Sequence, residues 1–258
     1  YRKNSNEAPI KETLAAVMAK LSRVRTDGTL IDPFCGSGTI LIEGAMLAMH
    51  IAPGLRRHFA AEKWKAVPGN IWDNERVAAK ALERRDEGFL AFGYDIDHEA
   101  VRLTLENAKK AGVAQYISAE VRDIKDFSND GPFGCVICNP PYFDRNAGAN
   151  APTAEKRTAR QDATCSVEEL AVAASFVLHT GGKAAFVFRP ERLWVLLEAL
   201  SRVRLVPKRM RFVHQSVQAA PSVVMVECRK GGSAEGLVVE PPLIVESDEY
   251  FRIYGIEH

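Results

Sequence analysis

The chain has 258 residues, of which 47% are hydrophobic and 26% are charged, and its formal net charge is +1. This length suits one large α/β domain, and the composition is that of an ordinary globular protein. The small net charge excludes a uniformly basic surface, so any basic patch that binds nucleic acid must be local. No stretch has the length and apolar character of a signal peptide or a membrane span.

Cysteine usage indicates a reducing environment. There are five cysteines, an odd number, and three lie in or beside apolar runs. This pattern predicts reduced thiols and a cytoplasmic protein. Cys135 and Cys138 form a CxxC pair, but no second Cys or His pair stands at zinc spacing. We therefore predict no metal site.

Apolar periodicity and turn residues predict helices that alternate with strands. Helices are expected over residues 8–24, 37–52, 98–112, 166–182 and 191–203. Strands are expected over residues 28–34, 89–97, 116–123, 133–139, 183–190, 204–215 and 221–231. Residues 52–88 are polar and irregular, with a helical stretch near 74–85, and are predicted to form an insertion.

This alternation predicts the α/β fold class. Strands joined by helices form a parallel sheet with helices on both faces. The last two expected strands follow each other without a helix, which predicts an antiparallel last strand. We therefore expect residues 1–258 to form a single domain around a seven-stranded, mostly parallel sheet.

Ligands of open α/β sheets bind at the carboxyl ends of the strands, so these ends are the candidate site. The first strand ends in DPFCGSGT, where Gly36 and Gly38 allow a ligand to approach the backbone at a helix N-terminus. Leu41 replaces the third glycine of a dinucleotide fingerprint, and no Lys follows Gly38 as in a phosphate loop. The structural alternative is a tight strand-to-helix turn.

The next two strands end in acidic residues. Asp95, in GYDID, can accept both hydroxyls of a ribose, whereas Asp97 is better placed to cap the following helix. Asp123 ends the third strand, where it can accept a hydrogen bond from an adenine amine. The alternative for Asp123 is a solvated acid in a loop.

The fourth strand ends in Asn139-Pro140-Pro141-Tyr142. The two prolines stiffen the chain, and the first favours an extended Asn139. A rigid Asn carbonyl beside a rigid aromatic ring suits a flat group that carries an amine. The structural alternative is a strand end followed by a turn.

These four strand ends, in this order, resemble the class I S-adenosylmethionine-dependent methyltransferases that modify exocyclic amines. The resemblance covers nearly the whole chain and implies a Rossmann-like fold, with residues 1–138 as the cofactor half and 139–258 as the target half. It implies S-adenosylmethionine as the cofactor, held by residues at and beside the strand ends. These are Thr13, Asp32, Phe34, Cys35, Gly36, Gly38, Asp95, Ile96, Asp123, Ile124 and Asn139.

The resemblance also implies a mechanism. The Asn139 side-chain carbonyl and the Pro140 backbone carbonyl accept the two hydrogens of the amine, and Tyr142 stacks on the base. Catalysis is then chiefly positioning and electrostatics, without a general base or a metal. A base must leave its stack to reach such a site.

The two halves resemble different enzymes. Residues 1–138 resemble the catalytic domain of the large guanine-N2 methyltransferases of 23S ribosomal RNA, which carry an upstream THUMP domain. Residues 139–258, with GGKAAFVFRPERL and LVPKRMRFVH, resemble the bacterial adenine-N6 methyltransferase of transfer RNA for valine. Together with the start at Tyr1, this suggests an engineered chimera joined near Asn139, although a natural sequence with both characters stays open.

Local basic clusters favour an RNA substrate. Residues 202–214 contain Lys208, Arg209 and Arg211 without an acid, and the loop after Tyr142 adds Arg157 and Arg160. Such cations can neutralise phosphates. The alternative is a solvated strand edge, where cations discourage aggregation.

Five functions follow, in order of support. The leading hypothesis is adenine-N6 methylation of transfer RNA, and the second is guanine-N2 methylation of 23S ribosomal RNA. Glutamine-N5 methylation of release factors and DNA adenine methylation are weaker. A module that binds cofactor or RNA without activity is the non-enzymatic alternative.

Overall fold

The computed structural model describes residues 1, 10–55, 57–127, 133–140, 165–245 and 247–249. Its helices are α1 (Glu12–Leu21), α2 (Thr39–Ala48), η1 (Ala60–Lys63), α3 (Gly69–Ala81), α4 (His98–Ala111), η2 (Ala114–Tyr116), η3 (Ile124–Asp126), α6 (Val167–Val177), η4 (Pro190–Arg192) and α7 (Leu193–Arg202). Its strands are β1 (Thr29–Asp32), β2 (Leu90–Asp95), β3 (Ile117–Val121), β4 (Phe133–Cys138), β5 (Leu178–Phe188), β6 (Leu205–His214), β7 (Pro221–Lys230), β8 (Val238–Val239) and β9 (Leu243–Ile244).

The strands form one nine-stranded sheet in the order β3-β2-β1-β4-β5-β7-β6-β8, and β9 also pairs with β6. Strands β3, β2, β1, β4 and β5 run parallel, whereas β7 is antiparallel to both of its neighbours, β5 and β6. This arrangement confirms the α/β class with a mostly parallel sheet. The two-residue strands β8 and β9, which the sequence did not predict, extend the seven expected strands.

The largest differences between predicted and observed helix boundaries are at the end of α6 and the start of α3. The helix expected over 166–182 ends at Val177, because Leu178 already pairs with Phe133 of β4. Gly181 has a φ of +82°, which a right-handed helix cannot include. In the insertion, α3 begins at Gly69, earlier than the expected residue 74.

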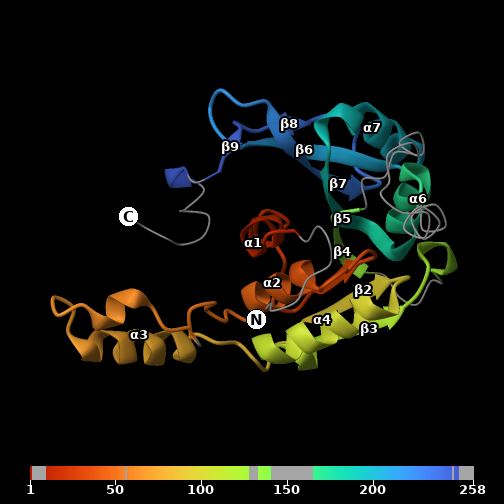
Figure 1. Cartoon of the computed structure of the whole chain (residues 1–258). Helices are drawn as coiled ribbons and strands as arrows, with labels where there is room; N and C mark the ends of the chain where they lie inside the picture. The colour runs from red at the N-terminus through yellow and green to blue at the C-terminus, as the bar shows by residue number, and fades with distance from the viewer. Residues whose placement is uncertain (2–9, 56, 128–132, 141–164, 246, 250–258) are drawn as a thin grey trace, which may run out of the picture.

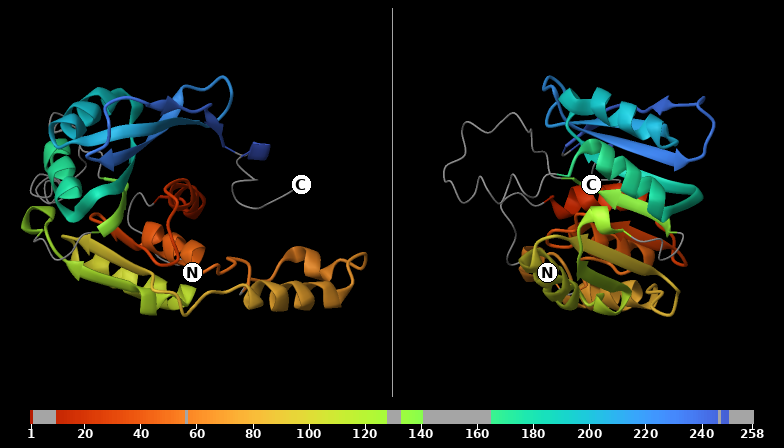
Figure 2. Two further views of the ribbon diagram at one scale, coloured as in Figure 1. Left: turned by 180° about the vertical axis from the view of Figure 1, so that it is seen from behind. Right: turned by 90° about the vertical axis from the view of Figure 1, so that its right-hand side faces the viewer.

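Helices cover both faces of the sheet, as Figures 1 and 2 show. On one face, buried side chains of α1, α2 and α4 pack with those of β1 and β2. On the other face, α6 and α7 pack over β4, β5 and β7. These two cores keep the strands aligned, so the position of each strand end is fixed.

The insertion forms an arm. Figures 1 and 2 show α3 directed away from the sheet. Phe59 and Trp72 stack with ring centroids 5.6 Å apart, and Arg76 forms an ion pair with Glu62. These contacts hold η1 against α3. Within the part of the chain that the structure describes, no helix is both long and apolar enough to cross a membrane.

Candidate active site at the carboxyl ends of the strands

The order of the strands reverses beside β1. The chain leaves β1 for β2 and β3 on one side, and then returns to β4 on the other side. The carboxyl ends of the central strands are aligned, since Ile31 of β1 pairs with Val136 of β4 and Asp32 pairs with Gly93 of β2. Such a reversal is where open α/β sheets hold their ligands.

The turn after β1 is fixed from several sides. The Asp32 carboxylate accepts a hydrogen bond from Phe34 N at 3.1 Å, and Cys35 N donates to Tyr94 O of β2 at 2.9 Å. Gly36 and Gly38 have φ angles of 53° and 79°, both in the left-handed region that favours glycine. The turn leads directly into the first residue of α2.

Two residues of α4 form hydrogen bonds with the backbone of this turn. Thr104 Oγ1 donates to Gly36 O at 2.9 Å, and Asn107 Nδ2 donates to Ser37 O at 3.0 Å. Both side chains are almost completely buried. Neither residue is among the predicted site residues, although small polar residues three positions apart on the apolar face of a predicted helix are the signal that could have found them.

The two glycines of the turn have different roles. A Cβ atom at Gly38 would lie 2.8 Å from Thr104 Cγ2, so Gly38 permits close packing of the turn on α4. No atom lies within 4 Å of a Cβ built at Gly36. Gly36 therefore leaves open space beside the backbone, as a turn that borders a ligand needs.

Asp95 links the ends of β2 and β1. Its carboxylate accepts from Gly36 N and from Asp97 N, each at 3.0 Å. A carboxylate has about four lone-pair positions, so two remain for a diol. The expected helix cap is also present, because Asp97 accepts from Glu99 N at 2.9 Å at the start of α4.

The residues after β2 and β3 line the same edge. Ile96 follows Asp95 and is 47% exposed, an apolar surface beside the acid. Arg122 N donates to Asp95 O at 2.9 Å, which places the end of β3 beside that of β2. Asp123 caps η3 by accepting from Lys125 N at 3.0 Å, and Ile124 is buried behind it.

Burial changes the ionisation of the acids. Loss of solvent raises the pKa of Asp32 to about 8, and the nearby Asp95 carboxylate adds to the increase. Burial also raises the pKa of Asp95. Desolvation likewise raises the pKa of the Cys35 thiol. This cysteine therefore packs as an apolar side chain and is not a nucleophile.

Asn139 and Pro140 stand where the prediction placed them, at the end of β4. Cys138 pairs with Phe186 of β5, so Asn139 leaves the sheet between β1 and β5. Asn139 is half-buried and Pro140 is buried. Tyr142, Arg157 and Arg160 lie outside the described residues.

Thr13 lies in a different place from the other predicted cofactor residues. It is exposed on α1 and lines a hollow with Glu43 and Met46 of α2 and with residues of the insertion. The strand-end residues do not line this hollow. The structure thus brings together Asp32, Phe34, Cys35, Gly36, Gly38, Asp95, Ile96, Asp123, Ile124 and Asn139, and leaves Thr13 aside.

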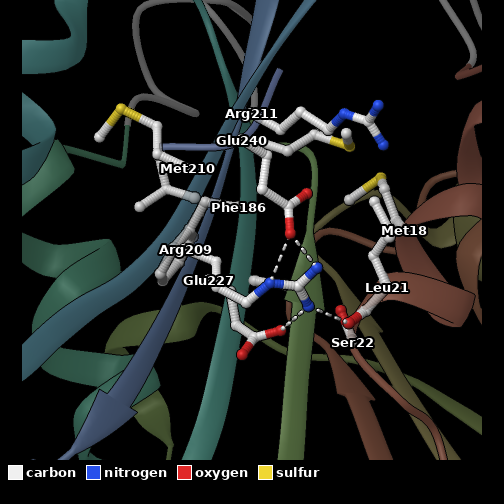
Figure 3. A pocket seen from close by; sticks show the side chains of 12 residues that line it. Met18, Leu21, Ser22, Phe186, Arg209, Met210, Arg211, Glu227 and Glu240 are labelled. Atoms are coloured by element: carbon white, nitrogen blue, oxygen red, sulfur yellow. Dashed lines mark hydrogen bonds and ion pairs between the residues drawn. The ribbon is translucent and has the colours of Figure 1, made fainter. Parts of the chain in front are cut away.

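The predicted RNA-binding cations of β6 are engaged within the chain. Arg209 contacts Glu227 at 3.5 Å, forms a hydrogen-bonded ion pair with Glu240, and donates to Leu21 O at the end of α1 at 3.3 Å (Figure 3). Arg211 is buried and pairs with Glu249 at 2.5 Å.

Lys208 is engaged as well, because its Nζ donates to Ser233 O and Glu235 O at 2.6 Å. Carboxylates and backbone carbonyls around β6 therefore bind the three cations that were predicted to bind phosphates. These three cations do not form the open basic surface that was expected. They join β6 to β7, to α1 and to the segment around β8 and β9.

The chain's residues fit S-adenosylmethionine in three respects. Open space borders Gly36, and Asp95 keeps acceptor capacity for a ribose diol. S-adenosylmethionine is cationic at its sulfonium and ammonium groups. Burial raises the pKa of Asp32 and so keeps its carboxyl group largely neutral. A neighbouring cation stabilises the ionised form of such a group.

Comparisons with known proteins show the family to which the chain is similar. The family model of UPF0020, described as the RMKL-like methyltransferase domain, matches residues 1–216. "Putative RNA methyltransferase YpsC" of Bacillus subtilis (strain 168) is 40% identical over 145 residues, which are 56% of this chain and 38% of that protein. The family match runs past Asn139, and a mosaic origin stays a prediction.

Two solved structures share the fold. SMU.472, "a putative methyltransferase complexed with SAH", is 25% identical with a TM-score of 0.68, and the match covers 90% of this chain and 55% of that one. A "predicted N6-adenine-specific DNA methylase from Listeria monocytogenes str. 4b F2365" is 25% identical with a TM-score of 0.66, covering 89% and 54%. The chain thus spans about half the length of these structures.

These findings confirm the predicted Rossmann-like class I fold and the methyltransferase class. S-adenosylhomocysteine in SMU.472 agrees with S-adenosylmethionine as the cofactor of this class. The family model covers most of the chain, including the four strand ends of the candidate site. The chain therefore belongs to the UPF0020 family of RMKL-like methyltransferase domains.

Proposed function

We propose that this chain transfers a methyl group from S-adenosylmethionine to an exocyclic amine of a base in RNA, with adenine N6 of transfer RNA as the favoured target. The observation that carries the proposal is the position of Asn139 and Pro140. They follow β4 directly, next to the turn after β1 and at the reversal of the strand order. Donor-binding and amine-binding groups are thus expected on neighbouring strand ends.

The cofactor supplies an electrophilic methyl group when bound. Asp95 would accept hydrogen bonds from the ribose hydroxyls of the cofactor, Asp123 would accept one from its adenine amine, and Asp32 would interact with its cationic groups. The carbonyls of Asn139 and Pro140 accept the two hydrogens of the target amine and orient its lone pair. The half-buried position of Asn139 and the buried position of Pro140 support acceptors that are held in place before the substrate arrives. Tyr142 is proposed to stack on the base.

Three observations support RNA and adenine. The relative from Bacillus subtilis carries the name of an RNA methyltransferase. The neighbour from Listeria monocytogenes is named for adenine N6, although on DNA. Residues 139–258 resemble the adenine-N6 methyltransferase of transfer RNA for valine, and this half contains the amine-binding end of β4.

Guanine N2 of 23S ribosomal RNA is the second candidate. Residues 1–138 resemble the enzymes with that specificity, and the amine of guanine presents the same two hydrogens to Asn139 and Pro140. Glutamine amides and DNA adenine offer similar groups. All four substrates suit the described acceptors, so the identity of the target depends on what surrounds them.

Product analysis tests the proposal. The protein is incubated with tritium-labelled S-adenosylmethionine and, separately, with unmodified transfer RNA, ribosomal RNA, DNA and a protein extract. Nucleosides of the labelled fraction are then identified by mass spectrometry. We expect N6-methyladenosine in transfer RNA. N2-methylguanosine in ribosomal RNA would support the second candidate, and label confined to DNA or protein would refute an RNA substrate.

A further inference from the structure

The side chain of Trp194 is 76% exposed, more than any other large hydrophobic residue among the described parts of the chain. It is the second residue of α7. The apolar residues of this helix that pack on the core are Leu193, Val195, Leu196, Leu197, Ala199 and Leu200. Trp194 lies instead on the outer stripe, four positions before the exposed Glu198. Packing among the residues that the structure describes therefore gives no reason for an indole at this position.

Trp194 lies at the same edge of the sheet as the candidate active site. Cys138 of β4 pairs with Phe186 of β5, so the carboxyl ends of these strands are neighbours. Only Arg189 and the single turn of η4 separate the end of β5 from α7. The first turn of α7 therefore stands at the same edge of the sheet as Asn139.

Cations accompany the indole. Arg189 is exposed between β5 and η4, and the Arg192 guanidinium lies 5.9 Å from the centre of the Phe188 ring. One exposed acid, Glu191, stands between them. An exposed aromatic side chain with neighbouring arginines is the combination that binds unpaired nucleotides, because the ring stacks on a base and the cation contacts a phosphate.

We infer that Trp194 stacks on a nucleotide of the RNA that flanks the target base, and that Arg189 contacts the backbone of the same strand. This inference rests on the proposed RNA substrate. A base that enters the active site leaves its neighbour unstacked, and the indole replaces the lost stacking partner. A partner protein would also cover an exposed Trp, but the arginines and the adjoining amine site favour a polyanion.

Kinetics with Trp194→Ala, Trp194→Phe and a matched control test the stacking contact. The control is Trp64→Ala, since Trp64 is also an exposed Trp, at 63%, but lies in the insertion. With transfer RNA as substrate, Trp194→Ala is expected to raise KM roughly 5- to 100-fold, the equivalent of removing one base–aromatic stack, with kcat within about twofold. Trp194→Phe retains an aromatic ring and is expected to keep most of the parent's affinity for the RNA, so its KM should rise little. Trp64→Ala is expected to keep the parent's KM.

Fluorescence supplies a readout that does not depend on turnover. The chain has three Trp residues, so the double variant Trp64→Phe/Trp72→Phe leaves Trp194 as the only tryptophan that contributes to the emission. Transfer RNA is expected to quench this emission as it binds. Arg189→Gln should flatten the salt dependence of binding by about one unit of slope, whereas Arg202→Gln at the far end of α7 should leave the slope unchanged.

The outcomes separate this inference from the proposed function. If the parent methylates RNA, but Trp194→Ala keeps the parent's KM and RNA does not quench Trp194, only the stacking inference is wrong. If Trp64→Ala and Trp194→Ala raise KM equally, the effect is not local and the inference is likewise wrong. If the parent labels only DNA or protein, the proposed function fails and the inference fails with it.

Discussion

The strand ends of the parallel half and the strand β6 both carry charged residues that the sequence analysis assigned to ligands. At the strand ends, the acids Asp32 and Asp95 accept hydrogen bonds from backbone N–H groups and keep further acceptor positions. On β6, the charges of Arg209 and Arg211 are matched by carboxylates of the same chain. The first set fixes a turn that borders open space at Gly36, whereas the second set joins elements together.

The difference teaches that the place of a charge in the fold is more informative than the charge itself. Side chains at the carboxyl end of a parallel strand do not contact the next element of the sheet. The middle of β6 has β7 on one side and α1 against its face. A charge in that position acquires partners during folding, since an unpaired partly buried charge is unfavourable.

Asn139→Ala is the change with the largest expected effect. It removes the acceptor that aims the amine and leaves the cofactor-binding acids untouched. We expect single-turnover methyl transfer to fall about 10²- to 10³-fold, typical of the loss of one preorganised polar group. Asn139→Asp keeps an acceptor and should retain partial activity.

The same samples distinguish this role from a structural one. Calorimetric affinity for S-adenosylmethionine and the melting temperature should stay near those of the parent. If melting temperature and activity fall together in Asn139→Ala, then the residue is a structural strand end. A parent-like transfer rate would show that Asn139 does not hold the amine.

Arg209→Met tests whether the cations of β6 stabilise the fold. It leaves Glu227 and Glu240 close together without their cation, and we expect a loss of about 2 kcal/mol in the free energy of unfolding. Arg202→Met is the matched control, because Arg202 forms an exposed helical pair with Glu198 and should contribute below about 0.5 kcal/mol.

Urea unfolding and RNA binding are measured on both variants. RNA affinity and its salt dependence should be the same as in the parent. The comparison breaks if Arg209→Met unfolds like the parent but binds RNA with a flatter salt dependence. In that case β6 would be an RNA surface after all.

The sequence predicts the parallel half of the site well because its signals are local. A strand, a glycine turn and a helix cap are encoded within a few residues, as Gly36, Gly38 and Asp97 show. The environment of Arg209 is not local. Its partners Glu227 and Glu240 come from β7 and from the segment after β8, so a window of residues without acids gave the wrong environment. The buried contacts of Thr104 and Asn107 also depend on helix packing that no short segment encodes.

Asp95→Ala sharpens the assignment of the strand-end acids. The carboxylate offers charge-assisted hydrogen bonds to a diol, so its loss should weaken S-adenosylmethionine binding by roughly 1–3 kcal/mol. Asp97→Ala is the control, since Asp97 caps α4 and should cost about 1 kcal/mol of stability without a specific loss of affinity. Isothermal titration calorimetry on folded proteins measures both. Equal affinities for the parent and Asp95→Ala would remove Asp95 from the cofactor site.

Asp32→Asn has the smallest expected effect and concerns the pH dependence of stability. The folded chain raises the pKa of Asp32 to about 8, above the value of about 3.9 in an unfolded chain. Between these values the folded state binds more protons than the unfolded state, so this group lowers stability as pH rises from about 4 to about 8. Below pH 4 and above pH 8 its contribution is constant.

Asn keeps an acceptor for Phe34 N and does not titrate, so Asp32→Asn should be less sensitive to pH than the parent in this window. Between pH 6 and pH 7 the difference in the free energy of unfolding between the two proteins should change by about 1 kcal/mol. The limit for the uptake of one proton is about 1.4 kcal/mol per pH unit. Urea unfolding at several pH values measures this change, with Asp126→Asn as an exposed control. Parallel stability curves for the parent and Asp32→Asn would show that Asp32 is ionised in the folded chain. The buried acid would then carry a full charge before any cationic ligand arrives.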